Sequence, residues 1–509
     1  MSLFLGIDAG TQSVKSIVIE SSSGRIMGAS SVNFGKDLPQ YASPNGFLPN
    51  ADPLIRRADP LMWLDALELM FRRLADSGIP LSAIRGISGS GQQHGTVYLS
   101  ERIEALRLES SLAEQIRPRL SRAESPIWMD RSTEQECREL NERFGERLRQ
   151  ETGSPAIERF SGPQIRKFAK EEPAAFRRTD RIHLVSSFLC SVLCGADAPI
   201  DFGDGAGMNL LNLKTLRWDS EIAEFTAPSL EKKLPPVLPS NSIAGRLDPY
   251  FAKYGFEPGI PIVVWSGDNP NSLVGVGAAE AGCAGISLGT SDTLFAPMRE
   301  FKTDPDGCGH VFGNPAGSFM SLICFSNGSL ARERVRDSLH VSWEFFDRDA
   351  CARTSPGNGG RLMLPYFEPE STPPVLSPRV CRNYQEASAA EEVRTLLESQ
   401  ALSLRLHSEW LGEKFRRIRL TGGASGSEGF QQILADVFQA ELETISVTNS
   451  AGLGAAIRAA NAVDGIAFEE LYARFCRPEK RVYPNPECRG IYEELLERFR
   501  LFEKQFPFC

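Results

Sequence analysis

The sequence has no apolar run long enough to cross a membrane. Its longest candidate, HLVSSFLCSVLCGA, is shorter than the about 20 apolar residues that a membrane helix needs, and it contains Ser and Cys. The sequence also lacks a cluster of basic residues, and its net charge of −9 disfavours a nucleic-acid surface. No basic leader precedes the first apolar run, so we expect no signal peptide and a cytoplasmic protein.

A regular cysteine framework is missing too. The 11 cysteines are scattered along the chain, which indicates reduced thiols rather than disulfides. The only close pairs of ligand-like residues are Cys190 with Cys194 and Cys308 with His310. A zinc site needs about four ligands, and no second pair matches either spacing. The sequence therefore favours core packing over metal binding for these residues.

Common nucleotide-binding signatures are also absent. No G-x-x-x-x-G-K-[ST] occurs, which excludes a P-loop enzyme, and the protein-kinase set of motifs is missing. GLGAAIRAA at 452–460 lacks the third glycine of a dinucleotide fingerprint and follows TNSA rather than a clean strand. We expect a helix there whose small residues serve packing.

Length and composition predict a globular protein of two domains. A single core stops growing at about 250–300 residues, and this chain has 509. Strand and helix patterns alternate, with a helix over 59–78 and Asp130 placed to cap the amphipathic helix that follows it. A proline-rich segment at 232–249 marks a boundary. We expect an N-terminal domain over 1–245, a C-terminal domain over 246–465, and a helical segment over 466–509 that could pack back on the first domain.

Two similar glycine turns stand out. FLGIDAGTQSVKSIVIE at 4–20 and GISLGTSDTLFAPM at 285–298 both read as a strand, a Gly-Thr turn and a second strand. Backbone N–H groups in such turns and small hydroxyls hold phosphoryl groups. A carboxylate beside phosphate needs a divalent cation between them, so Asp8 suggests a Mg²⁺ site. Two ordinary hairpins are the alternative, which the repetition of the turn makes less attractive.

Three further stretches carry candidate polar groups. GSGQQHG at 89–95 places Gln93 and His94 at a glycine-rich strand end, where they suit a polyol, although a lone His is more often structural. VVWSGDNPNS ends a buried strand at Asp268 and Asn269, where open α/β sheets place ligand groups. Asp268 could cap the next helix or act as a general base, and an ordinary aspartate there is ionised, with a pKa near 3.9. LTGGASGSEGF at 420–430 could hold an anion or lie against a purine.

These stretches, in this order, resemble the FGGY carbohydrate kinases. The resemblance runs essentially from end to end, and within the family it is strongest to the kinases of D-xylulose from eukaryotes. It rests on the stretches GIDAGTQSVK, ADPLMW, SGSGQQHG, SPIWMDRST, ERFSGPQIRK, GDGAGMNLL, GDNPNSL, SLGTSDTLF, CFSNGSL and TGGAS. It implies an α/β protein with two ribonuclease H-like domains of the actin–hexokinase type and a ligand cleft between them.

The resemblance also implies an activity and a site. The activity is ATP-dependent phosphorylation of D-xylulose at its 5-hydroxyl, with Mg²⁺ bound at Asp8 and with Asp268 as catalytic base. The sugar-binding positions are Gln93, His94, Arg159, Asp268 and Asn269. The nucleotide and phosphate positions are Gly10, Thr11, Gln12, Gly289, Thr290, Trp343, Gly422, Gly423, Ala424 and Ser427.

The sequence departs from the family pattern in two places and leaves rival functions open. PESTP at 369–373 replaces the family's GERTP and loses its Gly and Arg, and the usual Asn or Arg of the adenosine loop is replaced around Ser427. The rivals are a kinase of another ketose or polyol such as D-ribulose or a heptulose, an actin-like ATPase, and a non-catalytic sugar sensor. We expect the sugar and ATP as partners, with no nucleic acid and no membrane; the oligomeric state, monomer or dimer, stays open.

Overall fold

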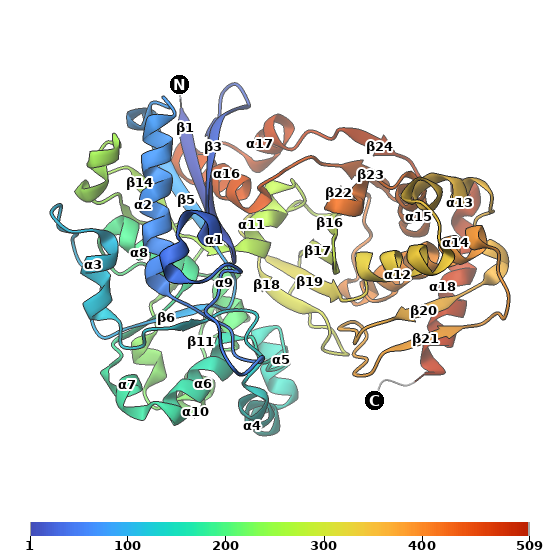
Figure 1. Ribbon diagram of the computed structural model, residues 1–509, viewed down its shortest axis with the longest axis horizontal. Coiled ribbons are helices and arrows are strands. Elements are labelled where there is room, and N and C mark those ends of the chain that lie inside the picture. The colour runs from blue at the N-terminus through green and yellow to red at the C-terminus, as the bar shows by residue number, and fades with distance from the viewer. Residues whose placement is uncertain (1, 507–509) are drawn as a thin grey trace. The chain divides into compact units, whose positions relative to one another are not determined.

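The computed structural model describes residues 2–506, which form two compact units. Unit 1 takes the chain up to Gly277, together with Val311–Phe319 and Thr448–Cys476. Unit 2 takes Ala278–His310, Met320–Val447 and the chain from Arg477 onward. Each unit is an α/β structure built on its own sheet (Figure 1).

The sheet of unit 1 contains the first predicted hairpin. Its strand order is β13-β14-β5-β1-β2-β3, and β15 pairs with β5 outside this path. The strands are β1 (Leu3–Ala9), β2 (Ser13–Glu20), β3 (Arg25–Asn33), β5 (Ile84–Gly91), β13 (Ile243–Arg246), β14 (Pro261–Val263) and β15 (Ser266–Gly267). The pairs β1–β2 and β2–β3 are antiparallel, whereas β5 is parallel to β1 and to β14.

Unit 2 repeats this arrangement. Its sheet contains β19 (Phe319–Phe325), β17 (Asp292–Met298), β16 (Cys283–Leu288), β22 (Arg417–Thr421), β23 (Glu441–Thr444) and β24 (Lys480–Val482), in that order. The β16–β17 hairpin is antiparallel, and β22 is parallel to β16 and to β23. The second predicted hairpin therefore takes the place in its sheet that β1–β2 takes in the first.

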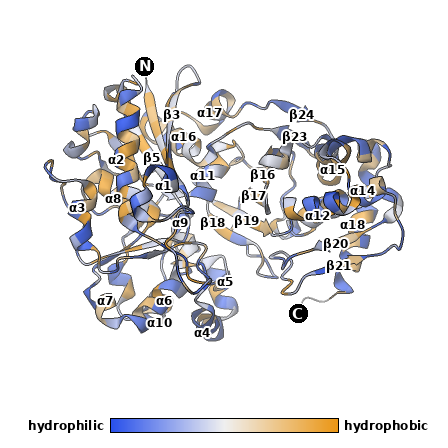
Figure 2. Ribbon diagram, viewed as in Figure 1, coloured by the Kyte–Doolittle hydropathy of each residue, from blue (hydrophilic) through white to orange (hydrophobic). Residues whose placement is uncertain are grey.

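Helices cover both faces of the first sheet. The expected helix at 59–78 is α2 (Pro60–Asp76), whose N-cap Asp59 accepts a hydrogen bond from Leu61 N at 2.8 Å. Hydrophobic and hydrophilic residues alternate along α2, as an amphipathic helix requires, and β1 is mainly hydrophobic (Figure 2). Leu5 and Ile7 share a hydrophobic core with α2, and Gly6 faces α16 (Ser450–Asp464) on the other side.

The GLGAAIRAA segment packs as expected. A Cβ built on Gly6 would lie 1.9 Å from Gly452 O, and one built on Gly454 would lie 1.9 Å from Asn271 O of α11 (Asp268–Gly275). Arg458, also on α16, is buried and donates to Asn271 Oδ1 at 2.9 Å and to Val264 O at 2.7 Å. Small residues thus bring α16 close to β1 and α11, and Arg458 fixes it there.

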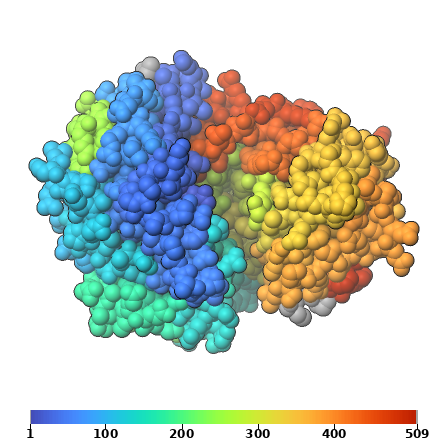
Figure 3. All heavy atoms as spheres, viewed as in Figure 1, coloured from blue at the N-terminus to red at the C-terminus, as the bar shows by residue number. Residues whose placement is uncertain are grey.

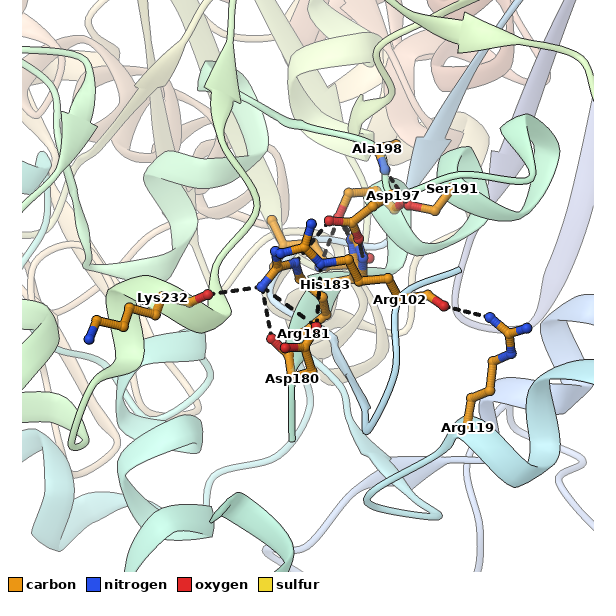
Figure 4. Close-up of polar contacts among 11 residues, drawn as sticks. Arg102, Arg119, Asp180, Arg181, His183, Ser191, Asp197, Ala198 and Lys232 are labelled. Carbon is orange, nitrogen blue, oxygen red and sulfur yellow. Dashed lines mark hydrogen bonds and ion pairs between the residues drawn. The ribbon is translucent and has the colours of Figure 1, made fainter. Parts of the chain in front are cut away.

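A polar cluster anchors another part of unit 1, the turn after α8 (Val185–Cys194). Asp197 accepts a hydrogen bond from Arg181 Nε at 2.8 Å and faces His183 Nε2 at 2.9 Å; both partners lie on β8 (Arg181–Leu184) (Figure 4). Burial acts to raise the pKa of Asp197, but the bonds from His183 and Arg181 hold that pKa below its usual value. Since β8 pairs with β6 (Thr96–Leu99), the cluster supports the segment that follows β5.

Three expectations about element boundaries differ from the structure. Asp130 does not cap α4 (Glu134–Phe144), whose N-cap position holds Thr133; its carboxylate instead accepts from Ser132 N and Arg56 N, each at 3.0 Å. Residues 246–277 group with unit 1, because β14 and β15 complete its sheet. The last helix, α18 (Arg489–Lys504), packs in unit 2, where Tyr492 OH donates to Glu398 Oε1 at 2.8 Å.

The remaining elements are mostly short. The helices are α1 (Phe34–Asp37), α3 (Leu112–Ile116), α5 (Glu146–Thr152), α6 (Ser161–Glu171), α7 (Pro173–Arg178), α9 (Phe202–Gly205), α10 (Ser220–Thr226), α12 (Ser329–Leu339), α13 (Ala350–Ala352), α14 (Ala389–Leu406), α15 (Glu428–Phe438) and α17 (Phe468–Phe475). The strands are β4 (Arg57–Ala58), β7 (Ser125–Pro126), β9 (Ile200–Asp201), β10 (Leu211–Asn212), β11 (Arg217–Trp218), β12 (Val237–Leu238), β18 (His310–Gly313), β20 (Met363–Tyr366) and β21 (Arg379–Arg382). The segment 34–58 forms part of the visible surface of unit 1 (blue in Figure 3). No helix within residues 2–506 has the length and apolar character of a membrane span.

The close packing of α16 gives a test of the fold. Gly454→Ala places a methyl group against the backbone oxygen of Asn271, and overpacking of this kind costs about 1–3 kcal/mol. We expect the melting temperature to fall by roughly 2–10 °C. Gly490→Ala is the matched control, since a Cβ there meets no atom within 4 Å. Equal melting temperatures for the two variants would contradict the packing described.

Candidate active site

Three strands of unit 1 end side by side, and the residues one before their last form a polar row. Asp8 of β1 is in register with Ser90 of β5, and Ser90 is in register with Ser266 of β15. All three strands are parallel, so their carboxyl ends meet at one edge of the sheet. Ligands bind at this edge in open α/β sheets. The structure thus places Asp8 and the segment around Asp268 together, as the sequence led us to expect.

Buried polar atoms at this edge lack hydrogen-bond partners. Buried side-chain oxygens and nitrogens in folded proteins are nearly always hydrogen-bonded, so a cluster of exceptions needs an explanation. Among the described residues, the unpaired atoms at the edge are Asp8 Oδ1, Ser90 Oγ, Gln92 Nε2, Gln93 Nε2, Asp204 Oδ1 and Ser266 Oγ. Their concentration at the strand ends is what a site for a polar ligand requires.

Asp8 has the properties of a cation ligand. Burial raises its pKa to about 6, against the opposing effects of Lys15 and the Ser90 hydroxyl. A cation beside the unpaired Oδ1 would favour the ionised form again. The described residues include no group of three or more His, Cys, Asp or Glu side chains able to hold a metal. Mg²⁺ fits such a site, because it commonly binds one or two carboxylates and takes its other ligands from water and phosphate.

Asp268 lies at the start of α11. Gly267 occupies the N-cap position, and Asp268 Oδ1 accepts a hydrogen bond from Asn269 N at 2.9 Å. Burial, together with the smaller effect of the nearby Asp8 charge, raises the pKa of Asp268 to about 7. The expectation of an ordinary pKa near 3.9 is therefore wrong, because the sequence does not reveal desolvation or the neighbouring acid. A carboxyl with a pKa near neutrality is a better proton acceptor than an ordinary aspartate.

Gln93 connects the strand end to Asp268. Asn269 Nδ2 donates to Gln93 Oε1 at 2.8 Å and to Asp268 Oδ1 at 3.2 Å. The amide of Gln93 is buried, and its nitrogen has no partner among the described residues. Gln93, Asp268 and Asn269 therefore form one connected polar group, which the sequence predicted only as separate motifs.

His94 is neutral and strained. Burial, together with the smaller effect of the Arg159 charge, lowers the pKa of His94 to about 3. Its ring stacks on Phe160 with centroids 4.4 Å apart, and its backbone has a φ of 69°. The Nδ1 atom lies 2.9 Å from Gly207 O, which can only accept a hydrogen bond. Nδ1 therefore carries the proton, and Nε2 is left as an acceptor.

The first Gly-Thr turn contacts Trp128, a residue that we did not predict to lie at the site. Gly10 N donates to Ser13 O at 3.0 Å, which closes the turn, and the Gln12 side chain is exposed. Trp128 Nε1 donates to Thr11 Oγ1 at 2.8 Å, although 42% of the tryptophan is exposed. The SPIWMDRST stretch contained Trp128, but no local pattern connects a tryptophan with a turn more than a hundred residues away.

The second Gly-Thr turn rests on a buried ion pair. Gly289 O accepts from Ser329 N at 2.8 Å, and Thr290 is exposed. Asp292, directly after the turn, accepts two hydrogen bonds of 2.8 Å from Arg332. Burial nevertheless raises the pKa of Asp292. This pair was not predicted, because an Asp and an Arg far apart in sequence carry no signal of their contact.

The proposed adenosine residues all lie in unit 2. Gly422 has a φ of 94°, and a Cβ there would lie 2.3 Å from Leu288 O, so the glycine joins the loop to the end of β16. A Cβ on Gly423 would meet no atom within 4 Å. Ala424 follows in the same turn, and Ser427 is buried at the N-cap position of α15. Trp343 is 40% exposed and stacks under Arg336 at 4.3 Å.

Comparison with known proteins decides the family. The N-terminal domain of the FGGY family of carbohydrate kinases matches residues 3–275, and the C-terminal domain of that family matches residues 284–463. The chain belongs to the FGGY carbohydrate kinases. The expectation drawn from the sequence stretches is therefore confirmed.

Named relatives of this FGGY kinase are xylulose kinases. The chain is 38% identical to xylulose kinase from Mus musculus, over 98% of this chain and 94% of the relative. It is 39% identical to xylulose kinase 2 from Arabidopsis thaliana, over 90% of this chain and 87% of the relative. The fold matches the crystal structure of xylulose kinase from Rhodospirillum rubrum with a TM-score of 0.85 at 19% identity, over 99% of this chain and 98% of that one. The two-domain actin–hexokinase-type fold is confirmed.

The PESTP segment of this FGGY kinase has a structural role, which falls to Glu370, the glutamate that PESTP shares with GERTP. Glu370 of PESTP is buried and accepts hydrogen bonds from Ser326 N at 2.5 Å and Asn327 N at 3.0 Å. Asn327 O in turn accepts from Gln400 Nε2 at 2.8 Å, and Gln400 Oε1 accepts from Arg332 Nη1 at 2.9 Å. The glutamate therefore ties its loop to the residues that support the second Gly-Thr turn.

The state of His94 can be measured directly. We expect a ¹⁵N spectrum of the ring nitrogens to show a protonated Nδ1 and a bare Nε2, with no titration between about pH 5 and pH 9, because burial holds the pKa near 3. The chain has 5 histidines, and the signal lost in His94→Gln assigns the resonance. A midpoint near 6.5, or a proton on Nε2, would contradict the geometry.

Proposed function

We propose that this protein transfers the terminal phosphoryl group of ATP to the 5-hydroxyl of D-xylulose. Support comes from family membership and from relatives that are named xylulose kinases and align over nearly their whole length. The observation that carries the proposal is the group of unpaired buried polar atoms around Asp268 at the strand ends of unit 1.

The sugar is proposed to bind at this edge. A polyol presents hydroxyls that both donate and accept, and the edge offers both kinds of partner. His94 Nε2 accepts, the Gln93 amide nitrogen donates, and Arg159 supplies a charged donor close to His94. Asn269 and Asp268 complete the set. The exposed indole of Trp128, beside Thr11, adds an apolar surface for the carbon chain of the sugar.

ATP and Mg²⁺ are proposed to bind at the two glycine turns and the adenosine loop. Asp8 would hold the cation, which neutralises phosphate charge when bound. Gly10, Thr11 and Gln12 in unit 1, and Gly289 and Thr290 in unit 2, offer backbone N–H groups and hydroxyls to phosphate. The bare surface of Gly423 suits a flat adenine. The proposed nucleoside positions are Trp343, Gly422, Gly423, Ala424 and Ser427.

The proposed phosphoryl transfer requires correct positioning of the reactants and one proton acceptor. Phosphoryl transfer depends mainly on orientation and on neutralising charge, with little covalent work for the protein. Asp268 is held by Asn269 N and Nδ2, which leaves its carboxylate directed by two hydrogen bonds. In the proposed reaction the ionised Asp268 accepts the proton of the 5-hydroxyl as that oxygen bonds to phosphorus. A general base typically contributes ~10²–10⁴-fold to the rate.

The rival functions leave these features unexplained or differ only in the sugar. An actin-like ATPase has no need for a neutral buried histidine beside Gln93 and Asp268. A sugar sensor has no need for a proton acceptor with a pKa near 7. A kinase of D-ribulose or a heptulose would use the same groups, so only substrate measurements separate it. The free thiols among the described cysteines support our proposal that the enzyme works in the reducing cytosol.

A sugar panel tests the proposal. With Mg-ATP in excess, kcat/KM is measured from ADP release for D-xylulose, D-ribulose, glycerol and a heptulose. We expect the highest value for D-xylulose. The reaction without sugar is the control and measures any ATPase activity. A higher kcat/KM for another sugar would overturn the choice of substrate. ADP release that no sugar stimulates would overturn the kinase itself.

A further inference from the structure

Asp204 is a buried acid that the proposed reaction does not use. It lies in α9, within GDGAGMNLL, and its backbone N donates to the N-cap Asp201 Oδ1 at 2.7 Å. The helix contacts β15, which leads into Asp268. The Asp204 side chain is fully buried: Oδ2 accepts from Ser186 Oγ at 2.5 Å, whereas Oδ1 has no partner. An acid left half-satisfied in the core is costly, so its presence calls for a role.

The missing partner lies close by. Gln93 Oε1 is taken by Asn269 Nδ2 at 2.8 Å, and this fixes which end of the amide is oxygen. The other end, Nε2, has no acceptor among the described residues and carries two N–H groups, so one can donate to Asp204 while the other donates to the sugar. A Cβ built on Gly267 would lie 2.9 Å from Asp204 Oδ1 and 2.5 Å from Gln93 Cγ. The unsatisfied acceptor, Asp204 Oδ1, and the side chain that carries the unsatisfied donor, Gln93, therefore both lie against the bare α-carbon of Gly267, directly before Asp268.

The charge state of Asp204 suits a contact with an amide. Burial raises its pKa well above the ordinary value, and the charges of Asp201 and Asp268 add to this, whereas the Ser186 hydroxyl and the nearby Gln93 side chain oppose it. A neutral carboxyl beside Asp268 avoids repulsion between two carboxylates. In the neutral acid the Oδ1 carbonyl still accepts from an amide, and the Oδ2 hydroxyl donates to Ser186 Oγ in place of accepting from it.

We propose that Asp204 is a positioning residue for the base, acting through Gln93. Its Oδ1 orients the Gln93 amide, Gln93 Oε1 holds Asn269 Nδ2, and Asn269 directs the Asp268 carboxylate. The inference rests on the proposed function, since it assigns Asp204 to the machinery around the base. Asp204 itself touches neither substrate nor nucleotide in this account.

A double-mutant cycle with Asp204→Ala and Gln93→Ala tests the proposal. Asp204→Ala should lower kcat about 10–100-fold and raise KM for D-xylulose, with KM for ATP unchanged, because displacement of a base by about 1 Å costs rate on this scale. In the Gln93→Ala background the same change should cost less than about threefold, since the path to Asp268 is already cut. Equal losses in both backgrounds would overturn the proposal.

Two further variants separate positioning from folding. Asp204→Asn keeps the carbonyl oxygen and a donor for Ser186, so it should recover most of the kcat lost in Asp204→Ala; failure to recover it contradicts the proposal. Ser186→Ala is the matched control, because it removes the other partner of Asp204 and leaves Oδ1 intact. We expect its kcat within about threefold of the parent enzyme. A loss as large as that of Asp204→Ala would make Asp204 merely structural.

Two further measurements are needed: the stability of each variant and the activity of the parent enzyme. Melting temperatures and calorimetric xylulose affinity are measured on every variant. If Asp204→Ala fails to fold, Asp204→Leu takes its place in the cycle, because it matches the shape of aspartate without its oxygens. The proposed function fails if the parent enzyme does not phosphorylate D-xylulose. The cycle is then run on the sugar that the parent enzyme prefers, so the two failures remain distinct.

Discussion

Desolvation of carboxyl groups at the strand ends of unit 1 is the constraint on which the site depends. Asp8 and Asp268 lie close enough for the charge of one to raise the pKa of the other, and burial raises both. Water would otherwise solvate these groups and return them to ordinary acids. The parallel pairing of β1, β5 and β15 brings them to one edge. Glycine makes the approach possible, since a side chain at Gly267 would collide with Gln93.

The two units use one strand order for different tasks. Both sheets place a hairpin with a Gly-Thr turn beside parallel strands. In unit 1 the neighbouring strand ends carry unpaired acids and amides. In unit 2 the Asp after the turn is paired in a bidentate bond with Arg332 and supports the turn rather than facing a ligand. In our proposal, the duplicated architecture therefore offers turns for phosphate in both units but a proton acceptor in only one.

Local sequence patterns predicted the elements well and the contacts between them poorly. The hairpins, α2 and the packing helix α16 were found because capping, alternation and small-residue patterns act over a few residues. Asp130 was assigned to the wrong structure because two kinds of hydrogen-bond donor compete for its carboxylate: the free N–H groups of a helix N-terminus and the N–H of Ser132 in a turn look alike in sequence. The contacts of Trp128 with Thr11 and of Asp292 with Arg332 join distant segments, so no local signal marks them. The raised pKa of Asp268 likewise depends on tertiary burial.

The central claim is that Asp268 takes the proton of the sugar hydroxyl, and Asp268→Asn tests it most directly. The amide oxygen can still accept from Asn269 N, so folding should change little, and an amide can still bond to a hydroxyl. We expect kcat to fall ~10²–10⁴-fold, with the calorimetric affinity for xylulose and the melting temperature close to those of the parent enzyme. Turnover within about threefold of the parent, far short of a general-base loss, would show that the base lies elsewhere.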